Sequence, residues 1–124
     1  MAKRYVTLQN RGHELPFSDA VLVDDTLYIS GRIGIDPRTG KVPENVNEEL
    51  RLLFGGFEAV LAEAEMTMED LVYVQVYCPN LSLFDAFNAA YRLYFSRDFP
   101  ARAFLGSGPL LLNGRFEMIG IARR

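Results

Sequence analysis

The sequence has 124 residues, of which 49% are hydrophobic and 23% are charged, with a formal net charge of −3. This length and composition predict one folded domain over residues 1–124 and exclude a disordered tail, a collagen-like repeat and a disulfide-stapled scaffold. The 13 lysines and arginines are scattered along the chain, which disfavours a nucleic-acid groove because such grooves cluster positive charge on one face.

The first predicted element is a β-hairpin. Two short apolar, β-prone runs, 21–23 and 27–29, flank Asp24-Asp25, a pair that tolerates turn geometry. Residues 36–40 are predicted to form a turn, because their proline presets one dihedral angle and their glycine can adopt a positive φ. The segment up to residue 40 is therefore expected to be mostly sheet.

A long helix is predicted over residues 46–65. Its apolar residues recur in steps of three and four, which places them on one helical face. Gly55 and Gly56 lie inside this helix, where each glycine costs about 1 kcal/mol relative to alanine. Either another backbone passes close to the helix there, or the fold tolerates weak helix formers. The apolar positions are Val46, Leu50, Leu53, Phe54, Phe57, Val60, Leu61 and Ala64.

A strictly alternating strand is predicted over residues 71–78. It has three valines and Cys78 on one face and Tyr73, Gln75 and Tyr77 on the other. The second face is too apolar to face water, so we expect a helix or another subunit to cover it. A second helix follows, with Ser82 and Asp85 in capping-box spacing. Its apolar stripe consists of Phe84, Phe87, Tyr91, Tyr94 and Phe95.

Two further strands, 103–107 and 115–122, are predicted to be joined across Asn113-Gly114, a strong turn signal. The element order is then β-β-β-α-β-α-β-β. This order predicts an α+β two-layer domain with a mixed sheet and both helices on one face. Nothing in one small chain remains to cover the other face, so we expect assembly through the sheet.

Arg102 carries the strongest chemical signal in the sequence. Pro100 stiffens the chain just before it, and the neighbouring residues are apolar. A guanidinium held in this way can give a carboxylate two parallel hydrogen bonds. The alternative is a surface arginine paired with an aspartate or glutamate.

The remaining candidates point to no cofactor. His13 stands in a polar stretch without a nucleophile beside it, which favours a solvated loop position over a general base. Cys78 is expected to be an inert core thiol. One histidine and one cysteine cannot supply a four-ligand metal site. The chain has no apolar run of signal-peptide or membrane-spanning length, so we expect a cytoplasmic protein without a membrane partner.

Several motifs, in order and spread over nearly the whole chain, resemble the RidA/YjgF family. This family was formerly labelled endoribonuclease L-PSP or translation inhibitor. The motifs are Pro16-Phe17-Ser18 with Ala20-Val21, then Leu27 to Ile33, Asp36 to Gly40, Phe87 to Tyr91, Phe99 to Arg102 and Phe116 to Ala122.

The resemblance implies a chorismate-mutase-like α+β fold and a homotrimer whose sheets pack into a central barrel, with a ligand pocket at each subunit interface. Active family members hydrolyse reactive enamines and imines, such as 2-aminoacrylate, to 2-keto acids and ammonia. By resemblance, Arg102 grips the substrate carboxylate, the Ser30-Gly31 backbone lines the pocket, and Asn88 is the pocket asparagine. The implied partners are a small carboxylate and further copies of the chain, without nucleic acid.

Three positions depart from the family pattern. Ile119 stands where deaminating members carry the second glutamate of Glu-x-Glu, Phe17 stands for a tyrosine, and Phe104 stands for a cysteine. Each change replaces a polar group by an apolar one around the implied pocket. They predict a ligand with one carboxylate and an aromatic or branched apolar body, unless Ile119 only repacks the barrel core.

Two charged residues near these positions are further candidates. Glu117 points to the same side of its strand as Ile119 but lies about 6–7 Å along it. Direct replacement of the missing acid is therefore doubtful, because proton transfer needs hydrogen-bond reach. Arg32 stands where the family commonly has glutamine, and a second cation there would favour a dicarboxylate. Strand alternation favours an outer or intersubunit position for Arg32 instead.

Two functions from different classes follow. The first is a deaminase of the 2-iminobutanoate/2-iminopropanoate type, a hydrolase in which Arg102 anchors the substrate. The second is a non-catalytic trimer that binds a small carboxylate metabolite, and the missing glutamate favours it. A ribonuclease or translation inhibitor, as the older labels suggest, is disfavoured by the acidic net charge.

Overall fold

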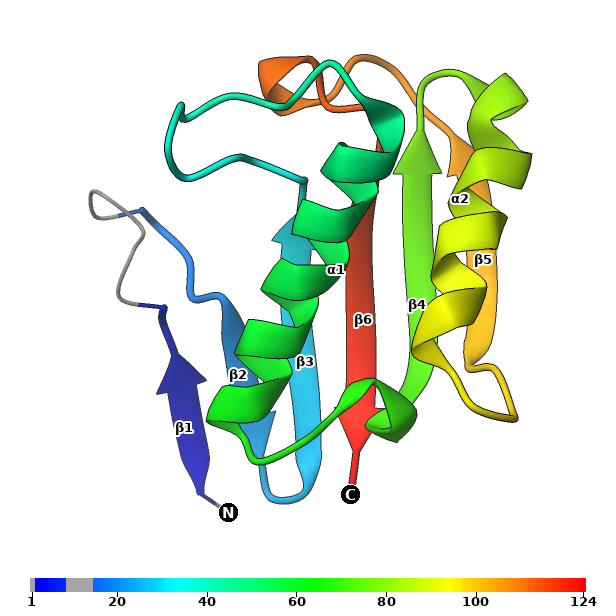
Figure 1. Ribbon diagram of the computed structural model, residues 1–124. Coiled ribbons are helices and arrows are strands. Elements are labelled where there is room, and N and C mark those ends of the chain that lie inside the picture. Colours follow the sequence, from blue (N-terminus) through cyan, green and yellow to red (C-terminus); the bar gives the residue numbers. More distant parts are fainter. Residues whose placement is uncertain (1, 9–14) are drawn as a thin grey trace.

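A computed structural model describes residues 2–8 and 15–124 (Figure 1). Its elements follow the predicted order. The strands are β1 (Lys3–Val6), β2 (Ala20–Val23), β3 (Thr26–Arg32), β4 (Leu71–Cys78), β5 (Ala101–Gly106) and β6 (Glu117–Arg123). The helices are α1 (Val46–Glu63) and α2 (Phe84–Tyr91), with short 3₁₀ turns η1 (Met68–Asp70), η2 (Leu81–Leu83), η3 (Arg92–Tyr94) and η4 (Leu111–Asn113).

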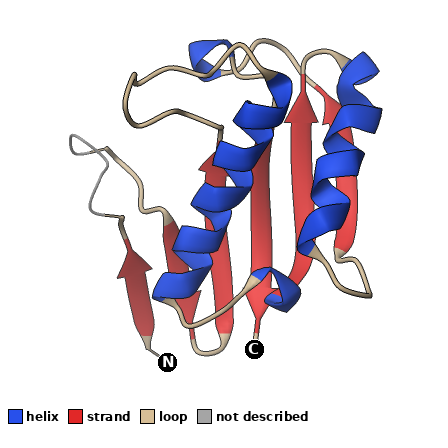
Figure 2. Ribbon diagram, viewed as in Figure 1, coloured by secondary structure: helices blue, strands red, loops and turns tan. Residues whose placement is uncertain are grey.

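The six strands form one sheet in the order β1-β2-β3-β6-β4-β5. All neighbouring pairs are antiparallel except β4 and β5, which run parallel. Both α-helices cover the same face of the sheet (Figure 2). The prediction of an α+β fold with a mixed sheet and two helices on one face is therefore confirmed. In the described part of the chain, no helix covers the other face.

The predicted link between the last two strands is wrong in its geometry. β6 lies between β3 and β4, so β5 and β6 are not neighbours. Asn113 does take a turn conformation, with a φ of 57°, but it ends η4 rather than a hairpin. A local turn signal reports a change of direction only; here the chain has to cross the end of β4 before it can enter the sheet as β6.

Helix α1 packs its predicted apolar face into the core. Its N-cap is Asn45, whose side chain accepts a hydrogen bond from the Glu48 N–H at 2.9 Å. Six apolar residues of this face, from Leu50 to Leu61, are fully buried. A search of the helices in residues 2–8 and 15–124 finds none that could span a bilayer.

The glycine pair in α1 makes room for a side chain, not for a backbone. A Cβ at Gly56 would lie 2.9 Å from the Nε atom of Arg32, whereas a Cβ at Gly55 would meet nothing within 4 Å. The expectation that another backbone passes close to the helix is therefore wrong. A guanidinium fills the space over Gly56 instead.

Two local details of the second half also differ from prediction. The alternation of β4 is broken by a register shift between Leu71 and Tyr73, which leaves Val72 49% exposed and turns Leu71 inward. The predicted capping box does not form, because Leu83 rather than Ser82 is the N-cap of α2 and the Ser82 hydroxyl donates to the Asn80 side chain at 2.7 Å. Helix α2 thus begins after a 3₁₀ turn that Asn80 caps.

A buried ion pair ties the start of α1 to the segment that leads into β6. The Glu49 side chain is fully buried. One of its oxygens accepts from the Arg115 Nη1 group at 2.7 Å, and the other accepts from the Arg115 backbone N–H at 2.7 Å. The Arg115 guanidinium also donates to the carbonyl groups of Pro43 and Glu44. The pair therefore fixes where β6 begins relative to α1.

Candidate functional site

A pocket of about 240 Å³ opens between the C-terminal half of α2 and the start of β5. It brings together two of the predicted site residues, Arg102 and Asn88. Helix α2 and η3 supply one wall, and the Phe99-Pro100 turn supplies another. The described lining residues are Asn88, Tyr91, Arg92, Phe99, Pro100 and Arg102.

The Arg102 side chain lies on the helix-covered side of the sheet. Its register partner on β4 is Val74, which is fully buried, and paired residues point to the same face. The Cζ atom of Arg102 lies 4.8 Å from the centre of the Tyr91 ring and between 5.4 and 5.7 Å from three phenylalanine rings. Among the described residues, no acid pairs with this guanidinium and no group accepts a hydrogen bond from it. Its donors are therefore free for a bound anion.

Tyr91, which lines the pocket, carries a polar group that is buried beneath its wall. The residue is 4% exposed, and its buried hydroxyl has no hydrogen-bond partner in the part of the chain that the structure describes. Burial raises the pKa of Tyr91 to about 12, an effect that the nearby Arg102 charge partly opposes. The hydroxyl is therefore protonated at neutral pH and keeps an unused donor.

A second group of predicted residues lies on the uncovered face. Between the pairs Ile29–Gly120 and Arg32–Met118, the two residues Ser30 and Gly31 stand against Ile119 alone, so β3 bulges there. A Cβ at Gly31 would collide with the Glu117 carboxylate and would lie 3.3 Å from the Ile119 side chain. Only glycine leaves the Glu117 carboxylate room to lie over this bulge.

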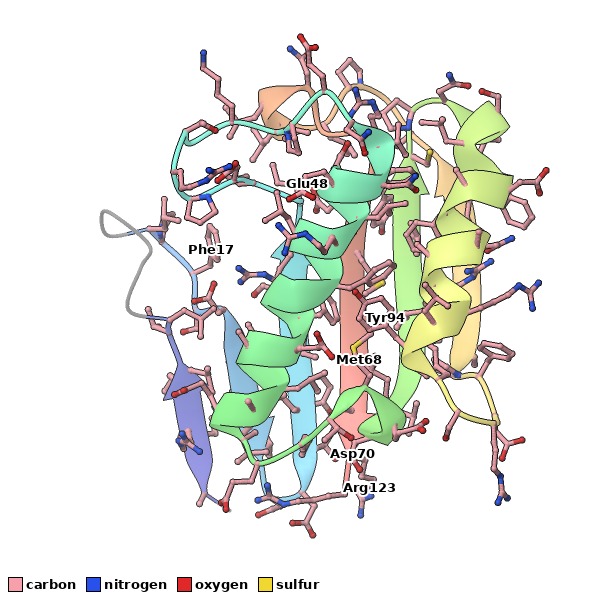
Figure 3. The ribbon with its side chains drawn as sticks, viewed as in Figure 1. Phe17, Glu48, Met68, Asp70, Tyr94 and Arg123 are labelled. Atoms are coloured by element: carbon pink, nitrogen blue, oxygen red, sulfur yellow. The ribbon has the colours of Figure 1, made fainter. Side chains whose placement is uncertain are left out.

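Ser30 and Phe17 lie near the same end of the molecule. The Ser30 hydroxyl donates to the Ser18 carbonyl oxygen at 2.6 Å, which ties β3 to the segment before β2. The Phe17 side chain is 51% exposed. Figure 3 shows Phe17 on one side of α1 and Tyr94, which follows α2, on the other. Phe17 is therefore remote from the α2 pocket within one chain.

Arg32 occupies neither the pocket nor an outer position. Its Nη1 group donates to Asp19 at 3.1 Å, and the Asp19 side chain is 8% exposed. The guanidinium packs over Gly56 of α1. The bulge at Ser30 and Gly31 turns Arg32 toward the helices, so the strand face expected from simple alternation is wrong. Its assignment as a ligand-binding residue stays a prediction.

Phe104 lies in the aromatic cluster beneath α2 rather than on the pocket wall. Its ring centre is 5.0 Å from that of Phe84 and 5.2 Å from that of Phe87. The expected apolar lining of the pocket therefore comes from Phe99 and Pro100. Cys78 is buried, as predicted, and burial raises the pKa of its thiol. His13 lies outside the described residues.

The two groups cannot form one site within a single chain. Arg102 and Asn88 lie on the helix-covered side, whereas Gly31, Glu117 and Ile119 lie on the other side. In addition, β3 and β5 are separated by β6 and β4, which corresponds to about 14 Å across the sheet. A pocket with all of these residues needs a second copy of the chain.

Comparison with known proteins identifies the family of the chain. The family model described as endoribonuclease L-PSP matches residues 9–124. The chain belongs to the RidA/YjgF family. A goat protein named 2-iminobutanoate/2-iminopropanoate deaminase is 39% identical over 108 residues, 86% of this chain and 79% of its own length. A RutC family protein from Aquifex aeolicus is 39% identical over 106 residues, 83% of this chain and 84% of its own length.

A solved structure agrees with the fold. RidA from the Antarctic bacterium Psychrobacter sp. is 28% identical, with a TM-score of 0.89 over 98% of this chain and 100% of that chain. At the family level, the chain is thus a relative of RidA-family deaminases. Within this RidA-family chain, the sequence analysis missed Tyr91 and Arg92 as pocket residues. The hint was their position three and four residues after Asn88, which places them on the same helical face.

Proposed function

We propose that the chain hydrolyses a reactive 2-imino or 2-enamino acid to a 2-keto acid and ammonia, with the substrate carboxylate held by Arg102. The observation that carries this proposal is the half-buried Arg102 guanidinium at the pocket, with no acid paired to it in the described chain. A guanidinium in a partly desolvated place gains most from a carboxylate that accepts two hydrogen bonds. The family relationship supports the reaction class.

The proposed reaction is the addition of water to the bound imine, followed by loss of ammonia. Water adds to the carbon of the C=N bond while the nitrogen takes up a proton. The C–N bond of the resulting carbinolamine then breaks, ammonia leaves and the carbonyl forms. Holding the carboxylate fixes the imine carbon where water can reach it. The Glu117 carboxylate is the acid–base candidate, because it lies over the Gly31 bulge beside the position of the missing glutamate.

We also propose that a homotrimer completes each pocket. The two groups of site residues occupy opposite faces of one sheet, and the face that carries Glu117 has no helix over it in the described chain. Tyr28 is 50% exposed on that face, where its register partner Ile121 also lies. A neighbouring subunit that covers this face would bring its Arg102 side to the Gly31 bulge. The trimer is testable by light scattering, and a monomer would remove the shared pocket.

A second function is favoured by one observation, the apolar Ile119 beside Glu117. Without a carboxylate at that position, the pocket retains its anion site and loses the expected proton carrier. The chain would then be a non-catalytic binder of a small carboxylate metabolite. Turnover measurements separate the two functions.

The deciding experiment measures ammonia release from imines generated in situ from a panel of amino acids. We expect turnover above the uncatalysed rate that falls at least tenfold in Arg102→Ala and is only partly restored in Arg102→Lys, which keeps the charge but not the planar fork. Arg97→Gln, which removes an arginine outside the described pocket lining, is the matched control. Turnover that persists in Arg102→Ala would contradict the anchor. No turnover on any imine would favour the binding function.

A further inference from the structure

The α2 pocket contains a second arginine. Arg92 lies in η3 immediately after α2 and lines the pocket together with Arg102. Its side chain has neither an ion pair nor a hydrogen bond with any residue that the structure describes. Two guanidinium groups therefore share one small pocket, and the described chain neutralises neither of them.

The other lining groups do not balance this charge. None of the described lining residues is acidic. Asn88 is neutral, and Tyr91 keeps its proton because its pKa is raised to about 12. Phe99 and Pro100 are apolar and contribute no charge. The lining thus carries two positive charges that a bound dianion would compensate.

The size of the pocket limits the ligand. A volume of about 240 Å³ lies below the roughly 300–1,000 Å³ of pockets that hold drug-sized ligands. The polar lining groups offer mainly hydrogen-bond donors, from two guanidinium groups and one amide. A matching ligand is compact and rich in acceptor oxygens at two ends.

We propose that this pocket selects a compact dicarboxylate, with Arg102 on the carboxylate next to the reacting carbon and Arg92 on the distal one. The reacting species rests on the proposed function and would be a 2-imino dicarboxylic acid. Selection of the dianion itself does not require turnover. The proposal moves the second cation from Arg32, which is bound to Asp19, to Arg92.

The test compares two stable product analogues with the same five-carbon chain, 2-oxopentanoate and 2-oxopentanedioate, by calorimetry. We expect the dicarboxylate to bind about tenfold more tightly, which corresponds to about 1.4 kcal/mol. In Arg92→Gln the ratio of the two affinities should fall to about one. In Arg92→Glu the monocarboxylate should bind more tightly than the dicarboxylate. Arg97→Gln removes a nearby charge outside the described lining and should keep the tenfold preference.

Turnover of the imines made from 2-aminopentanoate and glutamate separates the two proposals. A binding preference without turnover would overturn the deaminase and leave dicarboxylate selection intact. Turnover with equal affinity for both analogues would overturn dicarboxylate selection and leave the deaminase. A tenfold preference for the dicarboxylate that survives in Arg92→Gln would overturn the role of Arg92. Thermal unfolding checks that the two Arg92 variants are folded.

Discussion

The buried pair between Glu49 and Arg115 allows a stability prediction with a definite asymmetry. In Arg115→Met, the fully buried Glu49 carboxylate keeps only the backbone N–H at position 115 and loses the guanidinium at 2.7 Å. Breaking a buried pair from this side costs about 3–5 kcal/mol. In Glu49→Gln, the guanidinium is 31% exposed and keeps the carbonyl groups of Pro43 and Glu44. Glu49→Gln should therefore lower the free energy of unfolding by about 1–2 kcal/mol.

Urea unfolding measures both costs from the shift in midpoint at constant slope. All variants are compared at one protein concentration, because association changes the apparent stability. The double variant should cost at least about 1 kcal/mol less than the sum of the single costs, because the two side chains act as one unit. Arg51→Met is the control, since Arg51 pairs with Glu48 on the exposed face of the same helix and should leave the midpoint unchanged. An unfolding midpoint for Arg115→Met equal to that of the wild type would refute this reasoning. A larger loss of unfolding free energy in Glu49→Gln than in Arg115→Met would also refute it.

Three further predictions concern the site. Tyr91→Phe should raise or preserve the unfolding free energy, by up to about 1 kcal/mol, because it removes a buried hydroxyl without a partner. The wild type should lose more stability than this variant between pH 10 and 12, since the raised pKa keeps the proton on the folded state while the unfolded state releases it; urea titrations at pH 9 and 11.5 test this. Gly31→Ala should leave stability nearly unchanged, because the flexible end of Glu117 can move aside, yet lower imine turnover, whereas Gly34→Ala should destabilise strongly because its Cβ meets a backbone carbonyl of α1. Ile119→Glu should increase ammonia release by at least tenfold, and no increase would show that a carboxylate at this position is not limiting.

Local patterns in the sequence predicted most of the fold. Helix α1 was placed to within two residues of its C-terminus, because apolar spacing over five turns is a strong and local signal. The insertion of β6 between β3 and β4 was not predictable in this way, since the pairing joins residues far apart in the chain. The bulge at β3 and the register shift in β4 change which side chains face the helices, and simple alternation cannot anticipate them.

The candidate site was predicted unevenly for a related reason. Arg102 and Asn88 meet in one pocket, where a rigid turn and a helical face bring them together. Arg32 was misplaced because the bulge at Ser30 and Gly31 breaks the alternation of β3 and turns its side chain toward Asp19 and α1. Arg92 was overlooked because its position four residues after Asn88 shows only that the two share a helical face, and not that this face borders a pocket. The roles of these residues in binding and turnover stay predictions.

The central place of β6 delays completion of the sheet until the end of synthesis. The ribosome releases β1 to β5 before it releases residues 117–123, so the nascent chain carries two half-sheets, β1-β2-β3 and β4-β5, with nothing to join them. The complete sheet can therefore form only after translation of the last strand, and until then the facing edges of β3 and β4 are open templates for pairing with other chains. A premature stop codon or a proteolytic cut before residue 117 would make that transient hazard permanent, so truncated products should aggregate or be degraded rather than retain partial function.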